Sequence, residues 1–382
     1  MADLARTAES PRGRVMGGAG DRRSARATIL AARLKERIAR DGPLKVSDYM
    51  EACLSDSGAG YYTSRQPIGE AGDFITAPEV SQIFGELIGL WAVAVWQTMA
   101  EPKPIVVAEL GPGRGTLMED ALRAWRSAPR FLDSVSIGLI ETSPVLHEVQ
   151  QSALHGSPAP VMWYRGLDEV PDGPLILLAN EFIDALPIRQ LVHREGAWRE
   201  RRVVIDDKGG FAFSVGEKLS GLDLDAPDDA ILEIRPAVRP LLSSLARRAD
   251  QSPVAALIID YGHVESGLGD TLQAVSRHRF ADPLARPGDI DLTAHVDFAA
   301  LKDTALGVGL TVCGPLPQGE FLLKLGLEAR RDRLLETAKP EQRDSILSGA
   351  TRLIDPQQMG LLFKVLVLTS NGLASPPPFG ET

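Results

Sequence analysis

Three alternating glycines follow an apolar run directly, in the stretch VVAELGPGRGTL (Val106 to Leu117). Gly111, Gly113 and Gly115 come after a segment of strand length, and glycines in this position let a ligand approach the backbone closely. Two ligands suit such a loop, namely the pyrophosphate of a dinucleotide and S-adenosylmethionine. The remaining interpretation is a tight turn that binds nothing.

The spacing of these glycines and the nature of their neighbours separate the two ligands. A dinucleotide fingerprint reads G-x-G-x-x-G, whereas this loop reads G-x-G-x-G. Pro112 removes an N–H group that a phosphate would use, and Glu109 would place a carboxylate beside the anion. The same carboxylate would attract the ammonium group of S-adenosylmethionine. We therefore predict S-adenosylmethionine as the cofactor, bound by Glu109 and the three glycines.

A second acid ends the next apolar segment, SIGLIE. Glu141 can accept hydrogen bonds from both hydroxyl groups of a ribose, a contact that is also used for NAD and does not separate the cofactors by itself. Thr142, which follows it, and Leu167, beyond the segment VMWY, complete the cofactor-binding residues predicted in this part of the chain.

A third group of polar residues follows a further apolar segment, in LILLANEFIDALP. Ligands of doubly wound sheets bind outside the carboxyl ends of the strands, where these residues would lie. Asn180 is predicted to contact the cofactor. Glu181 and Asp184 are predicted to be catalytic, because carboxylates at a strand end can orient an acceptor and take up its proton, with Glu181 in the leading role. Alternatively, the two acids cap the following turn.

His295 is the third candidate catalytic residue, in the stretch DLTAHVDF. A histidine close to an acid, here Asp297, is more often part of a structural hydrogen-bonding pair, so both interpretations stay open. The chain contains 6 histidines and 2 cysteines, Cys53 and Cys313, and none of them has the close spacing of metal ligands. No metal site is predicted.

Short apolar segments alternate with helical patterns from Pro104 onward, which predicts the fold. IVVAEL, SIGLIE, VMWY, LILLAN and AALIID are apolar on both faces, as are the strands of a parallel sheet that is covered on both sides. TLMEDALRAW and SPVLHEVQQSAL are predicted helices, and LTVCG and LLFKVLVLT are two further strands. The expected fold is α/β, a Rossmann-like class I methyltransferase sheet with an N-terminal helical region and inserted β-meander and helices.

The other segments are assigned around this core. We expect a disordered tail at 1–28, an N-terminal helical lid region at 29–103, the methyltransferase core at 104–187 and 253–369, an insertion with a β-meander and a helix at 188–252, a helical insertion at 315–358, and a tail at 370–382. The apolar face that begins at Pro78 predicts one long core helix.

The composition argues against several functional classes. A formal charge of −10 disfavours general binding to nucleic acid or to an anionic membrane. No segment reaches the roughly 18 to 20 apolar residues that span a bilayer. The two distant cysteines suit a reducing compartment. The arginine-rich start contains acids and no apolar core, so we expect a disordered tail on a cytoplasmic protein, with the mitochondrial matrix as the alternative.

Five motifs closely resemble those of the MidA family of class I methyltransferase-like proteins: GDFITAPEVSQIFGE, ELGPGRGTL, NEFIDALP, IDYG and DLTAHVDF, in this order. The resemblance extends from about Gly42 to Leu368. It implies binding of S-adenosylmethionine and arginine methylation of the respiratory complex I subunit related to nickel-iron hydrogenases. It also places Gly72 and Asp73, in GDF, over the cofactor as a lid, whereas the residues alone are equally compatible with an ordinary turn.

The expected function is therefore an S-adenosylmethionine-dependent methyltransferase that acts on a protein arginine. Two alternatives stay open: methylation of a small carboxylate or hydroxyl metabolite, and a non-catalytic chaperone of complex I assembly that binds the cofactor structurally. A nicotinamide dehydrogenase is disfavoured by the glycine spacing and by Pro112. The helix from Pro78 and the insertions could form either a homodimer face or a groove for a partner.

Overall fold

The computed structural model describes residues 18–63, 76–276 and 279–380. At its centre, within the described residues, lies an eight-stranded sheet in the order β15-β16-β10-β5-β2-β3-β4, with β14 beside β10. Its strands are β2 (Ile105–Leu110), β3 (Val135–Ile140), β4 (Val161–Tyr164), β5 (Leu175–Asn180), β10 (Val254–His263), β14 (Val296–Asp297), β15 (Thr311–Pro317) and β16 (Phe363–Thr369). Every segment predicted to be a strand from its apolar residues contributes to this sheet, so the predicted α/β fold is confirmed.

The order of the strands creates a crevice at one edge of the sheet. The chain passes from β2 outward to β3 and β4, and then returns to β5 on the other side of β2. The pairs β2–β3, β3–β4, β2–β5 and β5–β10 are parallel, whereas β16 is antiparallel to both of its neighbours. Ligands bind where the strand order of a doubly wound sheet reverses, which here is at the carboxyl ends of β2 and β5.

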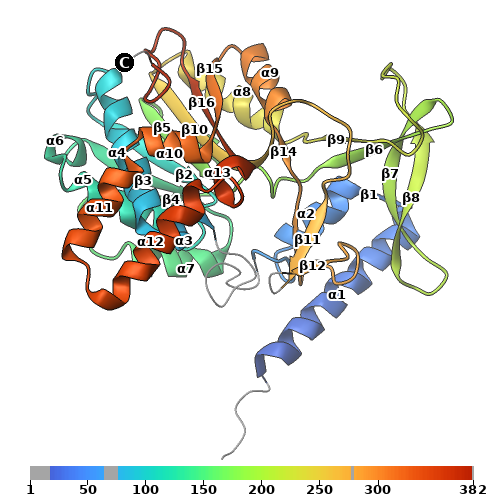
Figure 1. Ribbon diagram of the computed structural model, residues 1–382. Helices are drawn as coiled ribbons and strands as arrows, with labels where there is room; N and C mark the ends of the chain where they lie inside the picture. Colours follow the sequence, from blue (N-terminus) through green and yellow to red (C-terminus); the bar gives the residue numbers. More distant parts are fainter. Residues whose placement is uncertain (1–17, 64–75, 277–278, 381–382) are drawn as a thin grey trace, which may run out of the picture.

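Helices cover both faces of this sheet (Figure 1). One face is covered by α4 (Gln82–Thr98), α5 (Thr116–Trp125), α10 (Gln318–Lys324), α11 (Leu327–Thr337), α12 (Pro340–Ile354) and α13 (Met359–Leu362). The other face is covered by α8 (Val238–Ala249) and α9 (Phe298–Gly307). Short helices α6 (Pro129–Leu132), α7 (Pro144–Ala153) and η1 (Leu167–Glu169) connect the strands.

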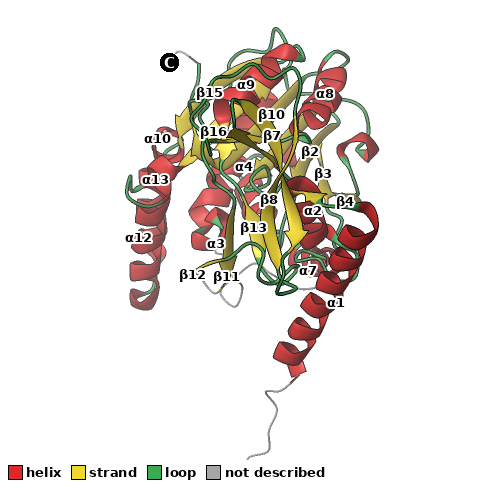
Figure 2. Cartoon of the chain, turned by 90° about the vertical axis from the view of Figure 1, so that its right-hand side faces the viewer, coloured by secondary structure: helices red, strands yellow, loops and turns green. Residues whose placement is uncertain are grey.

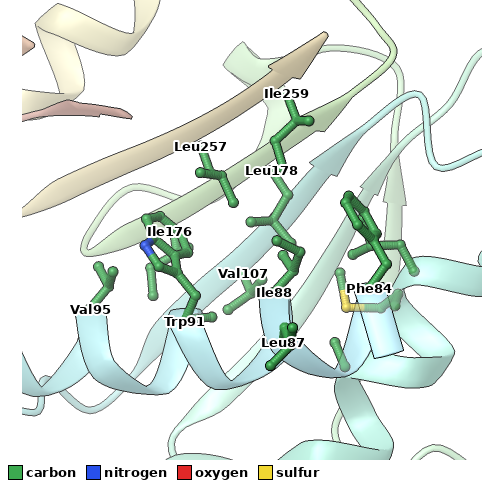
Figure 3. Close-up of a cluster of buried hydrophobic side chains, with 14 of the residues drawn as sticks. Phe84, Leu87, Ile88, Trp91, Val95, Val107, Ile176, Leu178, Leu257 and Ile259 are labelled. Atoms are coloured by element: carbon green, nitrogen blue, oxygen red, sulfur yellow. The ribbon is translucent and has the colours of Figure 1, made fainter. Parts of the chain in front are cut away.

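The core between α4 and the sheet explains why that helix is so apolar. Figure 3 shows its side chains directed at β2, β5 and β10, with Phe84, Leu87, Ile88, Trp91 and Val95 facing Val107, Ile176, Leu178, Leu257 and Ile259. Alternate residues of the same strands belong to the hydrophobic cluster on the other face. Burial on both faces is the physical reason for the continuous apolar runs in the sequence.

The helix predicted from Pro78 onward is divided in two. A short helix α3 (Ala77–Val80) ends at Ser81, whose backbone is extended, with φ −162°. The Ser81 hydroxyl then accepts a hydrogen bond from the backbone N–H of Ile83 and caps α4. A serine competes well for this position because its side chain satisfies an N–H group that the helix itself leaves unpaired. The apolar periodicity of the segment did not reveal this break.

The first described helix begins before the expected boundary of the N-terminal tail. α1 spans Gly18–Asp41, so part of the segment expected to be disordered is helical, and residues 1–17 lie outside the described residues. Leu30 and Leu34 are buried in its second half. Because the packed second half nucleates the helix, the helix can continue toward the N-terminus over alanine and arginine, which have high helix propensity.

A second sheet packs against the N-terminal helices, to the right of the main sheet in Figure 1 and facing the viewer in Figure 2. It comprises β1 (Leu44–Lys45), β6 (Arg189–Arg194), β7 (Ala197–Ile205), β8 (Phe211–Lys218) and β9 (Ile231–Ile234). A third, unpredicted sheet comprises β11 (Gln273–Ser276), β12 (Arg279–Ala281) and β13 (Asp291–Thr293). Both sheets share a hydrophobic cluster with α1 and with α2 (Val46–Ser55). Among the described helices, none is both long and apolar enough to cross a membrane.

Candidate functional site

A cavity of about 340 Å³ lies at the carboxyl ends of β2, β3 and β5. The sequence-predicted residues in its wall are Gly111, Gly113, Glu141, Thr142, Glu181 and Asp184. A small neighbouring cavity is lined by Glu109 and Asn180 and shares Gly111, Gly113 and Glu181 with the first. Three loops that are distant in the sequence therefore meet at the crevice where the strand order reverses.

The glycine loop has a backbone that other residues rarely adopt. Gly111, Gly113 and Gly115 have φ values of +60°, +54° and +84°. A Cβ atom on Gly111 would also lie 2.9 Å from a ring carbon of Phe182, so the loop after β5 packs directly on the loop after β2. Gly115 is outside both cavity walls and precedes the first residue of α5. The loop thus requires glycine for its conformation and for its close packing.

Two buried oxygen atoms beside this loop lack hydrogen-bond partners. They are Oε2 of Glu109 and Oδ1 of Asn180, and both residues line the small cavity. Glu109 is only 3% exposed, and burial raises the pKa of its carboxyl to about 8. Buried acceptors without donors are rare because they cost free energy. They match the ammonium group on the methionine portion of S-adenosylmethionine, so these residues fit that cofactor.

Glu141 lies at the end of β3, where its carboxylate is held from two sides. Oε1 accepts the backbone N–H of Ser143 at 2.7 Å, and Oε2 accepts Nε2 of Gln150 at 3.2 Å. The same Gln150 group donates to the carbonyl of Gly113 at 2.8 Å, which links Glu141 to the glycine loop. Burial raises the pKa of Glu141. A carboxylate fixed in this position could accept from the two hydroxyl groups of a ribose.

Glu181 follows β5 in a strained conformation, with φ +51°. Its Oε1 accepts the backbone N–H of Ala77 at 2.9 Å and Nδ2 of Asn180 at 3.3 Å. Burial raises the pKa of Glu181 to about 7, although the bond from Ala77 opposes the shift. Non-glycine residues with positive φ are concentrated at functional sites, where surrounding contacts maintain them. Such a carboxyl can exchange a proton near neutral pH.

Asp184 is 5% exposed, and its Oδ1 has no hydrogen-bond partner. Asp260 stabilises the turn that contains Asp184. Its Oδ2 accepts hydrogen bonds from the backbone N–H groups of Ile183 at 2.9 Å and Asp184 at 3.1 Å. Burial raises the pKa of the carboxyls of both aspartates, and the charge of Asp184 raises that of Asp260 further. Asp260 is fully buried and supports the turn through these hydrogen bonds, whereas Asp184 lines the cavity.

Further residues in the cavity wall had not been predicted from the sequence. They include Tyr62 and Thr63, Arg165, Tyr261, and Asp291 and Thr293 of β13. The Tyr62 hydroxyl donates to the carboxylate of Asp291, with both oxygens at 3.0 Å. Tyr261 directly follows Asp260 within β10, so the motif IDYG offered a signal for it. Nothing in the spacing linked Tyr62 to β13, because the third sheet was not predicted.

Among the predicted site residues that the structure describes, His295 and Leu167 lie outside both cavities, as Gly115 does. His295 lines a separate cavity of about 530 Å³, where burial and then the neighbouring His263 lower its pKa. The nearby Asp297 caps α9 by accepting the Ala300 N–H at 2.9 Å. Leu167 is buried in the hydrophobic cluster under α8, because η1 turns it inward. Gly72 and Asp73 lie outside the described residues.

The described residues contain no group of three or more histidine, cysteine, aspartate or glutamate side chains arranged to hold a metal ion. Cys53 is buried and Cys313 half-buried, and both are free thiols.

The parallel sheet with an antiparallel β16, combined with glycines and acids at its strand ends, defines a class I S-adenosylmethionine-dependent methyltransferase. A family model described as "Putative S-adenosyl-L-methionine-dependent methyltransferase" matches residues 87–316. The chain belongs to this family, which confirms both the predicted cofactor and the methyltransferase class.

The similarity to several known proteins extends over most of the chain. Protein arginine methyltransferase NDUFAF7 homolog, mitochondrial, of Drosophila melanogaster is 37% identical, covering 91% of this chain and 86% of that protein. The human protein arginine methyltransferase NDUFAF7, mitochondrial, is 35% identical, covering 89% and 83%. A Burkholderia thailandensis protein crystallised with S-adenosyl-homocysteine has a TM-score of 0.82 and 28% identity, covering 94% and 96%.

The names of these relatives correct one expectation from the sequence. A cytoplasmic location was expected because acids interrupt the arginine-rich N-terminus. The curated relatives are named mitochondrial proteins, which contradicts the cytoplasmic location and supports the mitochondrial alternative. Acidic residues near an N-terminus were therefore a poor reason to reject a mitochondrial location.

Proposed function

We propose that the protein methylates an arginine side chain of a protein substrate. The observation that carries this proposal is the group of carboxylates in the cavity wall, which includes Glu181 and Asp184, whereas Arg165 is the only cation among the described lining residues. An acidic cavity of this kind attracts a guanidinium group. The names of the relatives, which specify protein arginine methyltransferases, support the same acceptor.

The mechanism requires the protein to position an acceptor nitrogen and to take up its proton. S-adenosylmethionine supplies an activated methyl group, and its sulfur keeps the electrons of the broken carbon–sulfur bond. Asp184 holds the guanidinium through Oδ1, the oxygen without a partner in the free protein. Glu181 accepts the proton that the nitrogen loses when its bond to carbon forms. Oε1 of Glu181 is occupied by two donors, so Oε2 is the oxygen that receives this proton.

The cofactor is held by residues from three loops. Glu109 and Asn180 accept from the ammonium group, Glu141 accepts from the ribose, and the glycine loop gives the cofactor close access to the backbone. We infer in addition that the substrate is a complex I subunit. This identity rests on the resemblance of the motifs GDFITAPEVSQIFGE and NEFIDALP to the MidA family.

A single-turnover assay of methyl transfer tests the role of Glu181. Glu181→Gln keeps the size of the side chain and removes its basic oxygen, so transfer to the protein substrate should fall by at least about a hundredfold. Affinity for S-adenosylhomocysteine should stay unchanged. Glu217→Gln, at an exposed position in β8, removes the same charge outside the cavity and should leave the rate unchanged. Transfer by Glu181→Gln at the parental rate would contradict the assignment.

A small cationic metabolite is the second candidate acceptor. The acidic wall of the cavity would recognise a guanidinium or an amine whether or not a protein carries it, and the family description names no acceptor. Labelled methyl supplied to a mitochondrial extract distinguishes the two, since the label appears either in protein or in the small-molecule fraction. Label in neither fraction, with assembly of complex I dependent on the protein, would favour a chaperone that binds the cofactor without catalysis.

A further inference from the structure

Arg114 is the charged residue within the glycine loop, and it carries a polar atom without a partner. Its Nη1 donates to Oε2 of Glu79 at 3.2 Å, whereas its Nε is buried and has no hydrogen-bond partner. Arg114 lines the small cavity that Glu109 and Asn180 also line. An unsatisfied buried N–H group is unfavourable in the cofactor-free protein, so it marks a place where a ligand can supply an acceptor.

Glu79 fixes the orientation of this guanidinium. Glu79 belongs to α3, its side chain is 14% exposed, and its Oε1 accepts the hydroxyl of Thr116 at 2.6 Å. The contact from Arg114 uses Nη1, so the opposite edge, formed by Nε and Nη2, is not engaged by Glu79. That edge presents two parallel N–H groups, which is the arrangement that binds a carboxylate with two hydrogen bonds.

The three unpartnered atoms around the small cavity have complementary chemistry. Glu109 Oε2 and Asn180 Oδ1 are acceptors, and Arg114 Nε is a donor. An α-amino acid group combines one cationic donor, its ammonium, with one anionic acceptor, its carboxylate. We propose that Arg114 binds the α-carboxylate of the methionine portion of S-adenosylmethionine and that Glu79 is its positioning residue.

A purely structural role for Arg114 makes a different prediction. If the pair Arg114–Glu79 only connects α3 to the glycine loop, then replacing Arg114 should lower the affinity for all ligands of the cavity to the same extent. If Arg114 binds the carboxylate, the replacement should lower the affinity only for ligands that carry this group. The two roles therefore separate in the ratio of two affinities.

The experiment measures this ratio by calorimetry on the full chain. The probes are S-adenosylhomocysteine and its decarboxylated analogue, which lacks the carboxylate and keeps the ammonium. The parent protein should prefer S-adenosylhomocysteine by about tenfold or more, since a paired charge adds hydrogen bonds that a neutral contact cannot. Arg114→Met should remove that preference and leave binding of the analogue within about twofold, which also shows that the variant is folded.

Three further variants complete the test. Arg126→Met makes the same charge change at an exposed residue at the end of α5 and should keep the full preference. Arg114→Lys keeps the charge without the two-pronged edge and should retain part of the preference. Glu79→Gln should reduce the preference for S-adenosylhomocysteine over its analogue by a few fold, because the guanidinium is then less firmly oriented. Equal loss of both ligands with Arg114→Met, or an unchanged preference, would overturn the proposal, and neither result depends on methyl transfer.

Discussion

Cofactor binding should depend on pH through Glu109, and the structure gives the direction of this dependence. Burial raises the pKa of Glu109 from 4.5 to about 8 in the cofactor-free protein. The carboxyl is therefore mostly protonated at neutral pH and mostly ionised only above about pH 8. Only the ionised form can pair with the ammonium group of the ligand. Affinity should thus rise as the pH increases toward this pKa.

The size of the effect follows from the ionised fraction. With a pKa of about 8, that fraction is roughly 1% at about pH 6 and roughly 50% at about pH 8, a change of about fiftyfold. The α-amino group of the ligand belongs to a free amino acid with a carboxylate on the same carbon, so it stays largely protonated over this range. We therefore expect S-adenosylhomocysteine to bind about 50 times more tightly at about pH 8 than at about pH 6.

Isothermal calorimetry at several pH values measures this change directly. Two controls isolate its origin. 5′-Methylthioadenosine lacks the amino acid portion of the cofactor, so its affinity should not follow Glu109. Glu109→Gln cannot ionise, so its affinity for S-adenosylhomocysteine should be weak and nearly independent of pH below the pKa of the ligand amine. An affinity of the parent protein that stays level over this range would refute the reasoning about Glu109.

The raised pKa of Glu109 also affects the folding stability of the cofactor-free protein, which should decrease with rising pH, whereas the affinity for the cofactor increases. A carboxyl with a raised pKa in the folded state binds a proton that the unfolded chain releases between about pH 4.5 and about pH 8. The contribution of Glu109 to stability is therefore present below this window and is lost as the pH rises through it. The thermal midpoint of the cofactor-free protein should decrease with rising pH more steeply than that of Glu109→Gln.

Three further substitutions test other parts of the site and core. Glu141→Ala should weaken S-adenosylhomocysteine by about 1.5 to 3 kcal/mol in calorimetry, the range for hydrogen bonds to a charged group, and a change near zero would mean that the carboxylate does not reach the ribose. Gly111→Ala combines φ +60° with a contact of 2.9 Å to Phe182, so chemical denaturation should show a loss of about 1 to 3 kcal/mol, and parental stability would show that the loop relaxes freely. Leu178→Ala, at a residue only 1% exposed, should cost about 2 to 5 kcal/mol in the same assay, and a loss below about 1 kcal/mol would contradict close packing against α4.

The sequence predicted the central sheet well because its strands obey a strong physical constraint. A strand covered on both faces must be apolar along its whole length, and IVVAEL, LILLAN and AALIID meet this condition without exception at their centres. The carboxyl ends of such strands converge, so Glu109, Glu141 and Glu181 could be assigned to one site before their contacts were known.

The outer part of the site could not be predicted in the same way. Asp291 belongs to a strand of three residues, too short for a periodic pattern, and it reaches the cavity only because the third sheet packs on α2. Its partner Tyr62 lies in a turn, where neighbouring residue types do not report on contacts more than two hundred positions away. Likewise, the break at Ser81 depends on a single hydroxyl group, which hydrophobic periodicity does not detect.

The pairing of N-terminal residues with the distant second and third sheets has a consequence for synthesis on the ribosome. Leu44 pairs with Val203, and α1 and α2 share their hydrophobic cluster with Leu292. At about 5 to 20 residues per second, the apolar faces of these helices emerge roughly 12 to 50 seconds before Leu292 is added. During that interval they are exposed to chaperones and to other nascent chains. The wall that Tyr62 and Asp291 form together can close only after Asp291 has been added, so a truncated chain that lacks β13 should possess the glycine loop without a complete catalytic cavity.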